Sequence, residues 1–375
     1  MLLKNAEVLC ADFVLRRADV LVENGKIAVV EPHIDGDGID LSGKLLLPGL
    51  INVHTHGADG CDVMTANYDD INRMSMYMAK TGTTAFMPST STMLEPDIKS
   101  AMANIAAAME RGVDGACILG AHMEGPYLAA PKRGAHKQEW LRSVNEVDFD
   151  GIQQAAKGCV RMVTIAPETD GAMAFIEKNA HEIVISLGHT GADYDMCKKA
   201  FEFGANHVTH MFNAMPSIHH RTLTLIAAAF DSCAMVELIG DGLHVDPVTM
   251  RMAYNMFGDE RILIVTDSLA QTGMGDGVYE FAGTSIVITN GIARQSDGTI
   301  SGGTSNMWQC VNNLVSWGIS MPSAVKMASK NPAVSVGVYD KKGSIGVGKD
   351  ADLLIADKSL NLLSVMIDGK FITKQ

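Results

Sequence analysis

Short apolar runs recur along the middle of the chain, and patterns typical of amphipathic helices separate most of them. Each run is bounded by polar or turn-forming residues, which favours a buried strand. The eight predicted strands are 50–54, 84–88, 117–124, 161–166, 183–189, 207–210, 234–239 and 262–267. The helical patterns cover 69–80, 97–111, 193–203, 247–257, 304–317 and 322–329.

Eight strand–helix units over roughly 250 residues are typical of a (β/α)8 barrel. The competing fold is a doubly wound open sheet, whose dinucleotide-binding version carries Gly-x-Gly-x-x-Gly after its first strand. That motif does not follow residues 50–54. The sequence therefore predicts an α/β protein with a TIM-like barrel over residues 47–342, including a β-rich excursion at 277–300, and the open sheet stays as the alternative.

The two ends of the chain share a different pattern, in which short strands are joined by tight turns. Asn24-Gly25 separates two apolar runs near the start of the chain, and Asp368-Gly369 does so near its end. Both dipeptides are strong hairpin signals. We therefore expect residues 1–46 and 343–375 to form one small β-sandwich domain built from both termini.

Composition and charge narrow the class of protein. Hydrophobic residues make up 47% of the chain and 36 residues are glycine, which suits a globular α/β protein. The net charge of -13 argues against a nucleic-acid surface, and no run approaches the ~20 apolar residues of a membrane span. The seven cysteines contain no C-x-x-C pair and no signal peptide is visible. We therefore expect a cytoplasmic protein without nucleic-acid or membrane partners.

The first predicted barrel strand ends in His54-Thr55-His56-Gly57. Residues i and i+2 of a strand share a face, so both imidazoles project together where the strand ends. Two such rings can hold one divalent metal ion through neutral nitrogens. An isolated His-x-His is more often a solvated loop, so the interpretation depends on the other strands.

Four further strands end on residues suited to the same chemistry: Glu124, His189, His210 and Asp267. Each alone has a structural explanation, as a satisfied polar residue, an ion-pair partner or a helix cap. In a barrel of this kind, however, all strand ends meet at one face, where active sites lie. Four histidines and two carboxylates at that face are a ligand set for Zn²⁺ or a similar divalent ion.

The motifs around these residues resemble a known family over nearly the whole chain. They are Pro48-Gly49, His54-Thr55-His56-Gly57, His122-Met123-Glu124-Gly125-Pro126-Tyr127, Gly188-His189-Thr190, Thr209-His210-Met211-Phe212-Asn213-Ala214-Met215, Asp241-Gly242-Leu243-His244 and Gly346-Val347-Gly348-Lys349-Asp350-Ala351-Asp352. Together they resemble the N-acetylglucosamine-6-phosphate deacetylase family of the amidohydrolase superfamily. Ala166-Pro167-Glu168 offers no lysine for the carbamylated bridge of the dihydroorotase and hydantoinase branch, which disfavours that branch.

The resemblance implies metal-dependent hydrolysis of the acetamide of N-acetyl-D-glucosamine 6-phosphate to D-glucosamine 6-phosphate and acetate. His189, His210 and Glu124 would bind the principal ion, and His54 with His56 a second. The centre would thus hold one or two divalent ions, with zinc favoured over iron, manganese or cobalt. Asp267 would be the catalytic acid and base, taking a proton from water and returning it to the departing amine.

The resemblance also implies a set of substrate contacts. Asn213 and Ala214 would offer backbone amides to the phosphate, and Arg221 a charge-assisted contact. His136, with Ala135 beside it, would contact a sugar hydroxyl. His244 resembles a phosphate-side residue that reaches across a dimer interface, which implies a homodimer.

Two departures from the family pattern lie in segments that would bind the substrate. Arg221 is followed by Thr222-Leu223-Thr224 rather than Glu-Pro-Gly, and Ile300-Ser301-Gly302-Gly303 replaces Leu-Ala-Gly-Ser. The galactosamine epimer and the need for the phosphate therefore stay open. So do another amidohydrolase activity, such as a cyclic amidase or N-acyl-amino-acid hydrolase, and a non-catalytic barrel scaffold.

Overall fold

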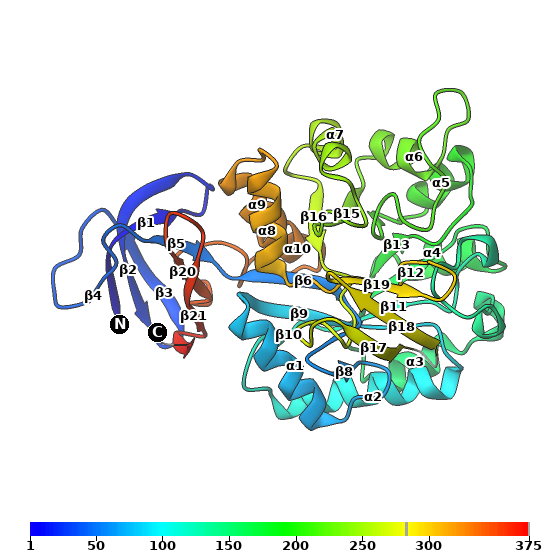
Figure 1. Cartoon of the computed structure of the whole chain (residues 1–375), viewed down its shortest axis with the longest axis horizontal. Coiled ribbons are helices and arrows are strands. Elements are labelled where there is room, and N and C mark those ends of the chain that lie inside the picture. Colours follow the sequence, from blue (N-terminus) through cyan, green and yellow to red (C-terminus); the bar gives the residue numbers. More distant parts are fainter. Residues whose placement is uncertain (282–283, 374–375) are drawn as a thin grey trace.

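A nearly closed barrel of parallel strands forms the larger part of the molecule, and both chain ends lie in a smaller sheet beside it (Figure 1). The computed structural model describes residues 1–281 and 284–373. The barrel strands are β6 (Leu50–Thr55), β9 (Thr83–Thr90), β10 (Cys117–Ile118), β11 (Ala121–Glu124), β12 (Val160–Ile165), β13 (Val184–Leu187), β14 (His207–Val208), β15 (Met235–Ile239) and β16 (Ile262–Val265). The predicted fold class is confirmed, and the open sheet is excluded.

The barrel closes between its last strand and its first. Successive strands pair in parallel from β6 through β9 and β11 to β16. Across the remaining gap, the N–H of Asp267 donates to the carbonyl of His54 at 3.1 Å. The side-chain amide of Asn52 donates to Thr266 Oγ1 at 2.7 Å. These bonds bring the end of β16 against the end of β6, two of the strand ends where the sequence predicts chemistry.

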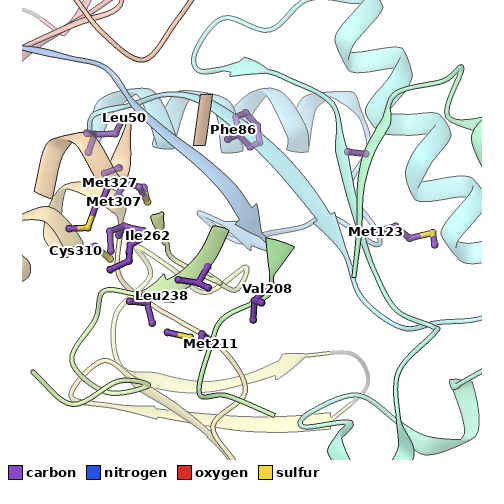
Figure 2. Packing of buried hydrophobic residues seen from close by; sticks show 14 of the residues in the cluster. Leu50, Phe86, Met123, Val208, Met211, Leu238, Ile262, Met307, Cys310 and Met327 are labelled. Carbon is purple, nitrogen blue, oxygen red and sulfur yellow. The ribbon is translucent and has the colours of Figure 1, made fainter. Parts of the chain in front are cut away.

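Helices surround the strands and bury their apolar faces against them. They are α1 (Tyr68–Lys80), α2 (Glu95–Arg111), α3 (Phe149–Ala155), α4 (Ala172–Asn179), α5 (Tyr194–Glu202), α6 (Leu225–Asp231), α7 (Pro247–Phe257), α8 (Met307–Ser316), α9 (Met321–Ala328) and α10 (Lys330–Ser335). Figure 2 shows Ile262 of β16 beside Met307 and Cys310 of α8. Such burial of apolar surface supplies most of the stability of an amphipathic helix.

The smaller part is one sheet drawn from both chain ends. Its strands are β1 (Leu2–Leu9), β2 (Leu15–Glu23), β3 (Lys26–Glu31), β4 (Ile39–Asp40), β5 (Leu45–Pro48), β20 (Leu353–Ala356), β21 (Leu362–Ile367) and β22 (Lys370–Thr373). A sandwich was expected, but β5 pairs with β1 on one side and β20 on the other, which joins all strands into one sheet. The predicted domain boundaries stay predictions; residue 46 lies inside β5, and residues 374–375 lie outside the described part.

The connection between the two parts is tight. Gly49 links β5 to β6, and a Cβ at this position would lie 2.1 Å from Thr84 Oγ1, so only glycine fits. Nearby, the largely buried ammonium group of Lys342 bonds Asp350 at 2.9 Å and Asp352 at 2.7 Å. The two carboxylates compensate a charge that would otherwise be costly to bury.

A three-stranded antiparallel sheet follows the last barrel strand, within the excursion predicted at 277–300. It comprises β17 (Gly277–Phe281), β18 (Thr284–Thr289) and β19 (Ile292–Gln295), and residues 282–283 lie outside the described part. Figure 1 shows these yellow strands lying across the barrel. The side chain of Gln295 donates to the carbonyl of Ala135 at 3.4 Å, which ties this sheet to the loop that carries His136. A short ribbon, β7 (Gly57–Ala58) with β8 (Cys61–Asp62), follows β6.

Candidate metal centre and active site

The five predicted ligands, from four strand ends, meet around one buried space. Glu124 lies at its middle: its Oε1 is 3.1 Å from His210 Nε2 and 3.3 Å from His189 Nε2, and its Oε2 is 3.1 Å from His56 Nε2. His54 Nε2 is 3.3 Å from His56 Nε2. Ligand atoms around a tetrahedral zinc ion are separated by about 3.4 Å, given bonds of 2.0–2.1 Å. The spacing fits a metal centre with Glu124 between His54 and His56 on one side and His189 and His210 on the other.

Hydrogen bonds on the far side of three rings orient them for metal binding. The Nδ1 atoms of His54, His56 and His189 face the carboxylate of Glu237, the carbonyl of Ser89 and the carbonyl of Lys132, at 2.9, 3.2 and 2.9 Å. These acceptors require a proton on Nδ1, so the Nε2 lone pairs point into the centre. This arrangement is typical of metal-ligating histidines. His210 differs, because its buried Nδ1 makes no hydrogen bond within the described residues.

His136 also reaches Glu124, but in the opposite tautomer. Its Nδ1 accepts the backbone N–H of Thr92 at 3.3 Å, so its proton lies on Nε2. That Nε2 is 3.2 Å from Glu124 Oε2 and donates to it. His136 is therefore a hydrogen-bond donor at the edge of the centre, although its position beside Glu124 and His189 satisfies the distances of a ligand.

The electrostatics of the space favour positive charge. Burial opposes a charge on the His56 ring, but Asp267 and Glu124 outweigh it and raise the pKa of His56 to about 9. Burial would raise the pKa of Glu124, and the surrounding histidines hold it well below its usual range instead. A metal ion supplies the same positive charge as these protons while leaving the rings neutral.

Asp267 lies above the pair of histidines from β6. Its Oδ1 is 3.5 Å from His54 Nε2 and 3.3 Å from His56 Nε2. Its backbone is fixed by the bond to the carbonyl of His54 and by a second bond from Gly303 N–H, at 2.7 Å. Its φ of +48° is rare for residues other than glycine. Such a backbone aims the carboxylate into the pocket rather than along the strand.

The pocket above the centre contains most of the predicted substrate residues. It is lined by His56, Ser91, Thr92, Glu124, Gly134, Ala135, His136, Lys137, Trp140, His189, His210, Asn213, Ala214, His244, Asp267, Thr299, Ile300, Ser301 and Gly302. Thr299 and Ile300 come from the end of the excursion, so this segment forms one wall. Lys137 and Trp140 form another, with the ammonium group 4.4 Å from the ring centre.

Three of the predicted substrate residues have the following positions in the structure. The N–H of Asn213 donates to the carbonyl of His210 at 3.0 Å, so it is engaged in its own turn. His244 lines the pocket of its own chain, with Nδ1 held by Asp241 at 2.7 Å, so it need not come from a partner. Arg221 lies on an exposed loop outside the pocket lining. Local sequence patterns do not encode the course of such a loop.

Sequence reasoning missed Glu237, a fully buried residue of β15. Burial would raise the pKa of its carboxyl group, but His54 opposes it and lowers that pKa to about 2. The only signal for it in the sequence is a lone acidic residue within an apolar strand. Ser91, Thr92 and Lys137 were missed because they lie in loops, and Trp140 because it lies in a short 3-10 helix (Gln138–Trp140), without a distinctive pattern.

Comparison with known proteins identifies relatives over the full length of the chain. Residues 45–372 match the amidohydrolase family. An N-acetylglucosamine-6-phosphate deacetylase from Bacillus subtilis is 34% identical, over 100% of this chain and 98% of its own. An N-acetylgalactosamine-6-phosphate deacetylase from Escherichia coli O157:H7 is 33% identical, over 93% of both chains.

Solved structures agree with these sequence relatives. A variant N-acetyl-D-glucosamine-6-phosphate deacetylase from Mycobacterium smegmatis, in complex with N-acetyl-D-glucosamine-6-phosphate, has a TM-score of 0.94 and 31% identity, covering 100% of this chain and 99% of its own. An N-acetylglucosamine-6-phosphate deacetylase from Pasteurella multocida has a TM-score of 0.92 and 30% identity, covering 99% and 98%.

Proposed function

The chain belongs to the amidohydrolase family, among its N-acetylglucosamine-6-phosphate deacetylases, and from this membership we propose that it hydrolyses N-acetyl-D-glucosamine 6-phosphate to D-glucosamine 6-phosphate and acetate. The observation that carries the proposal is the convergence of Glu124, four histidines and Asp267 at the floor of one pocket. A barrel kept only as a scaffold would have no need to retain this set.

We assign two divalent ions to the centre, one held by His189, His210 and Glu124 and one by His54 and His56. The position of Glu124 between the two pairs of histidines and the orientation of the Nε2 atoms support this assignment. Nitrogen and carboxylate ligands favour zinc, although iron, manganese and cobalt accept the same set. A divalent ion bound there would acidify water and polarise the amide carbonyl.

Asp267 carries out the proton transfers of the proposed reaction. A carboxylate oxygen of Asp267 takes a proton from the attacking water as oxygen bonds to the acetyl carbon. The carbon–nitrogen bond then breaks, and Asp267 returns the proton to the sugar nitrogen, which leaves as an amine. The second proton of the water ends on that amine, so acetate and the protonated amino sugar account for all atoms. His136 carries a proton on Nε2 and donates a hydrogen bond to Glu124, so it holds that carboxylate in place at the edge of the centre.

A panel of substrates tests the proposal. We expect the purified enzyme to release acetate from N-acetylglucosamine 6-phosphate with a kcat/KM roughly 10- to 100-fold above that for the unphosphorylated sugar, since a charged hydrogen bond is lost. N-acetylgalactosamine 6-phosphate belongs in the panel because of the relative from Escherichia coli O157:H7. Faster acetate release from that epimer than from N-acetylglucosamine 6-phosphate would show that the galactosamine sugar is the preferred substrate. Turnover of a cyclic amide or an N-acyl amino acid alone would overturn the deacetylase assignment.

We infer a homodimer as well, because exposed apolar residues surround the loop that carries Arg221. Ile218 and Leu223 flank Arg221 and are 52% and 44% exposed, and Phe230 of α6 lies in the same groove at 50%. A second copy covering this groove would carry its own Arg221 toward the first copy. Arg221, rather than His244, is therefore the residue we expect to contribute across the interface.

Oligomeric state in solution tests this arrangement. We expect light scattering to give twice the chain mass, and Ile218→Glu to shift it toward the monomer because a charge would enter an apolar contact. The monomer should also show a higher KM for the phosphorylated sugar than the dimer does, while the KM for the free sugar stays the same. A monomeric wild-type protein with normal activity would exclude the dimer.

We place the enzyme in the cytoplasm. All seven cysteines are free thiols, including exposed Cys233, which suits a reducing compartment. Among the described residues, no helix combines the length and the apolar character needed to cross a bilayer.

A further inference from the structure

A buried carboxylate lies beneath the candidate metal centre and bonds both of its halves. Glu237 is fully buried in the barrel interior, on β15. Its Oε2 accepts the Nδ1–H of His54 at 2.9 Å and the backbone N–H of His210 at 3.0 Å. Its own carbonyl accepts the N–H of Met211 at 2.8 Å. One residue thus contacts the first strand of the barrel and the loop after the sixth.

The cost of burying this group indicates that its contacts matter. Barrel interiors are filled mainly by branched apolar residues, and the neighbouring Val236, Leu238 and Ile239 of the same strand are fully buried. A carboxylate in such a place is unfavourable unless its hydrogen bonds compensate the loss of water. In Glu237 the compensating donors belong to two of the proposed ligands.

The two bonds act on different features of the ligands. The bond to His54 fixes the ring in the tautomer whose Nε2 faces the centre. The bond to His210 holds a backbone with a φ of +27°, which a residue with a side chain rarely adopts. Without the acceptor, the ring of His54 can turn and the peptide of His210 can relax away from the centre.

We propose that Glu237 is a positioning residue that sets the geometry of both metal subsites at once, His54 through its ring and His210 through its backbone. This inference rests on the proposed two-ion centre. It goes further by assigning metal affinity to a residue that touches neither ion nor substrate. It also links the subsites, because a displacement at either ligand is transmitted to the same carboxylate.

Metal binding measured without substrate tests the inference. Chelator-stripped protein is titrated with Zn²⁺ against a chromophoric chelator, and bound ions are counted by elemental analysis. We expect Glu237→Leu, which removes the acceptor at similar volume, to weaken Zn²⁺ binding about 10- to 100-fold. Glu237→Gln keeps an oxygen for the same two donors, so it should recover most of the affinity.

Control variants separate the inference from general damage to the barrel. Ser186→Ala removes a different fully buried polar group, a hydroxyl that bonds Thr209 at 2.6 Å and contacts no proposed ligand. The Ser186→Ala variant should bind Zn²⁺ as the wild type does. Where Glu237→Leu does not fold, Glu237→Asp takes its place, since the shorter side chain keeps the charge but cannot reach both donors. It should weaken binding in a folded protein.

The outcomes are distinct. Wild-type affinity in both Glu237→Leu and Glu237→Asp, or an equal loss in Ser186→Ala, would overturn the positioning role while leaving the two-ion centre intact. A wild-type protein that binds no Zn²⁺, Mn²⁺ or Fe²⁺ would instead overturn the proposed centre, and the inference with it.

Discussion

Asp267→Asn is expected to lower kcat for acetate release by about 10³-fold while the number of bound ions stays the same. Asparagine has nearly the same shape, and the backbone bonds of residue 267 to His54 and Gly303 do not involve the side chain. The amide, however, cannot accept the proton of the attacking water or return it to the amine. The loss should therefore appear in kcat more than in KM.

A matched substitution shows whether that loss is specific. Asp59 is exposed and has a similar backbone, with a φ of +53° against +48° for Asp267. Asp59→Asn should keep wild-type turnover. Near-normal activity of Asp267→Asn would show that another group moves the proton. If Asp267→Asn lost a bound ion together with its activity, the main role of Asp267 would be that of a metal ligand. Its position beside His54 and His56 allows this role.

Glu124→Gln is expected to remove bound metal and to lower activity by roughly 10³-fold, because the loss of an ion costs several kcal/mol of transition-state stabilisation. The carboxylate of Glu124 faces five imidazoles, those of His54, His56, His136, His189 and His210. A neutral amide there would supply no charge to hold an ion and would place N–H donors against nitrogen lone pairs. Elemental analysis and acetate release measure the two effects.

His136→Gln provides the comparison for this prediction. Because Nδ1 of His136 accepts from Thr92, its Nε2 is a donor and not a ligand. This variant should therefore lose activity but retain both ions. Loss of metal from His136→Gln would place His136 among the ligands, and retention of both ions by Glu124→Gln would remove Glu124 from the centre.

The sequence predicted the barrel and the floor of its site for one physical reason. Parallel strands are buried on both faces, so they appear as apolar runs, and a polar residue at the end of each run marks the face where the active site lies. His54, Glu124 and Asp267 follow this rule. Glu237 could not be found in this way, because it lies inside a run, where an acidic residue looks like an interruption.

Features that depend on contacts distant in sequence were harder to predict. The sandwich expected at the chain ends is one sheet, because β5 pairs with strands from both termini. The position of Arg221 outside the pocket depends on the path of an exposed loop, which hydrophobic patterns do not specify. The role of 277–300 as a wall of the pocket likewise follows from its docking on Ala135.

The position of β5 between β1 and β20 also affects biosynthesis. A growing chain emerges N-terminus first, so β5 leaves the ribosome long before its partner β20 exists. During that interval Leu45, Leu46 and Leu47, all buried in the finished protein, lie on an open strand edge. Open apolar edges recruit other chains. That edge is covered only once β20 has been made, so a strand that carries none of the ligands protects the new chain from aggregation.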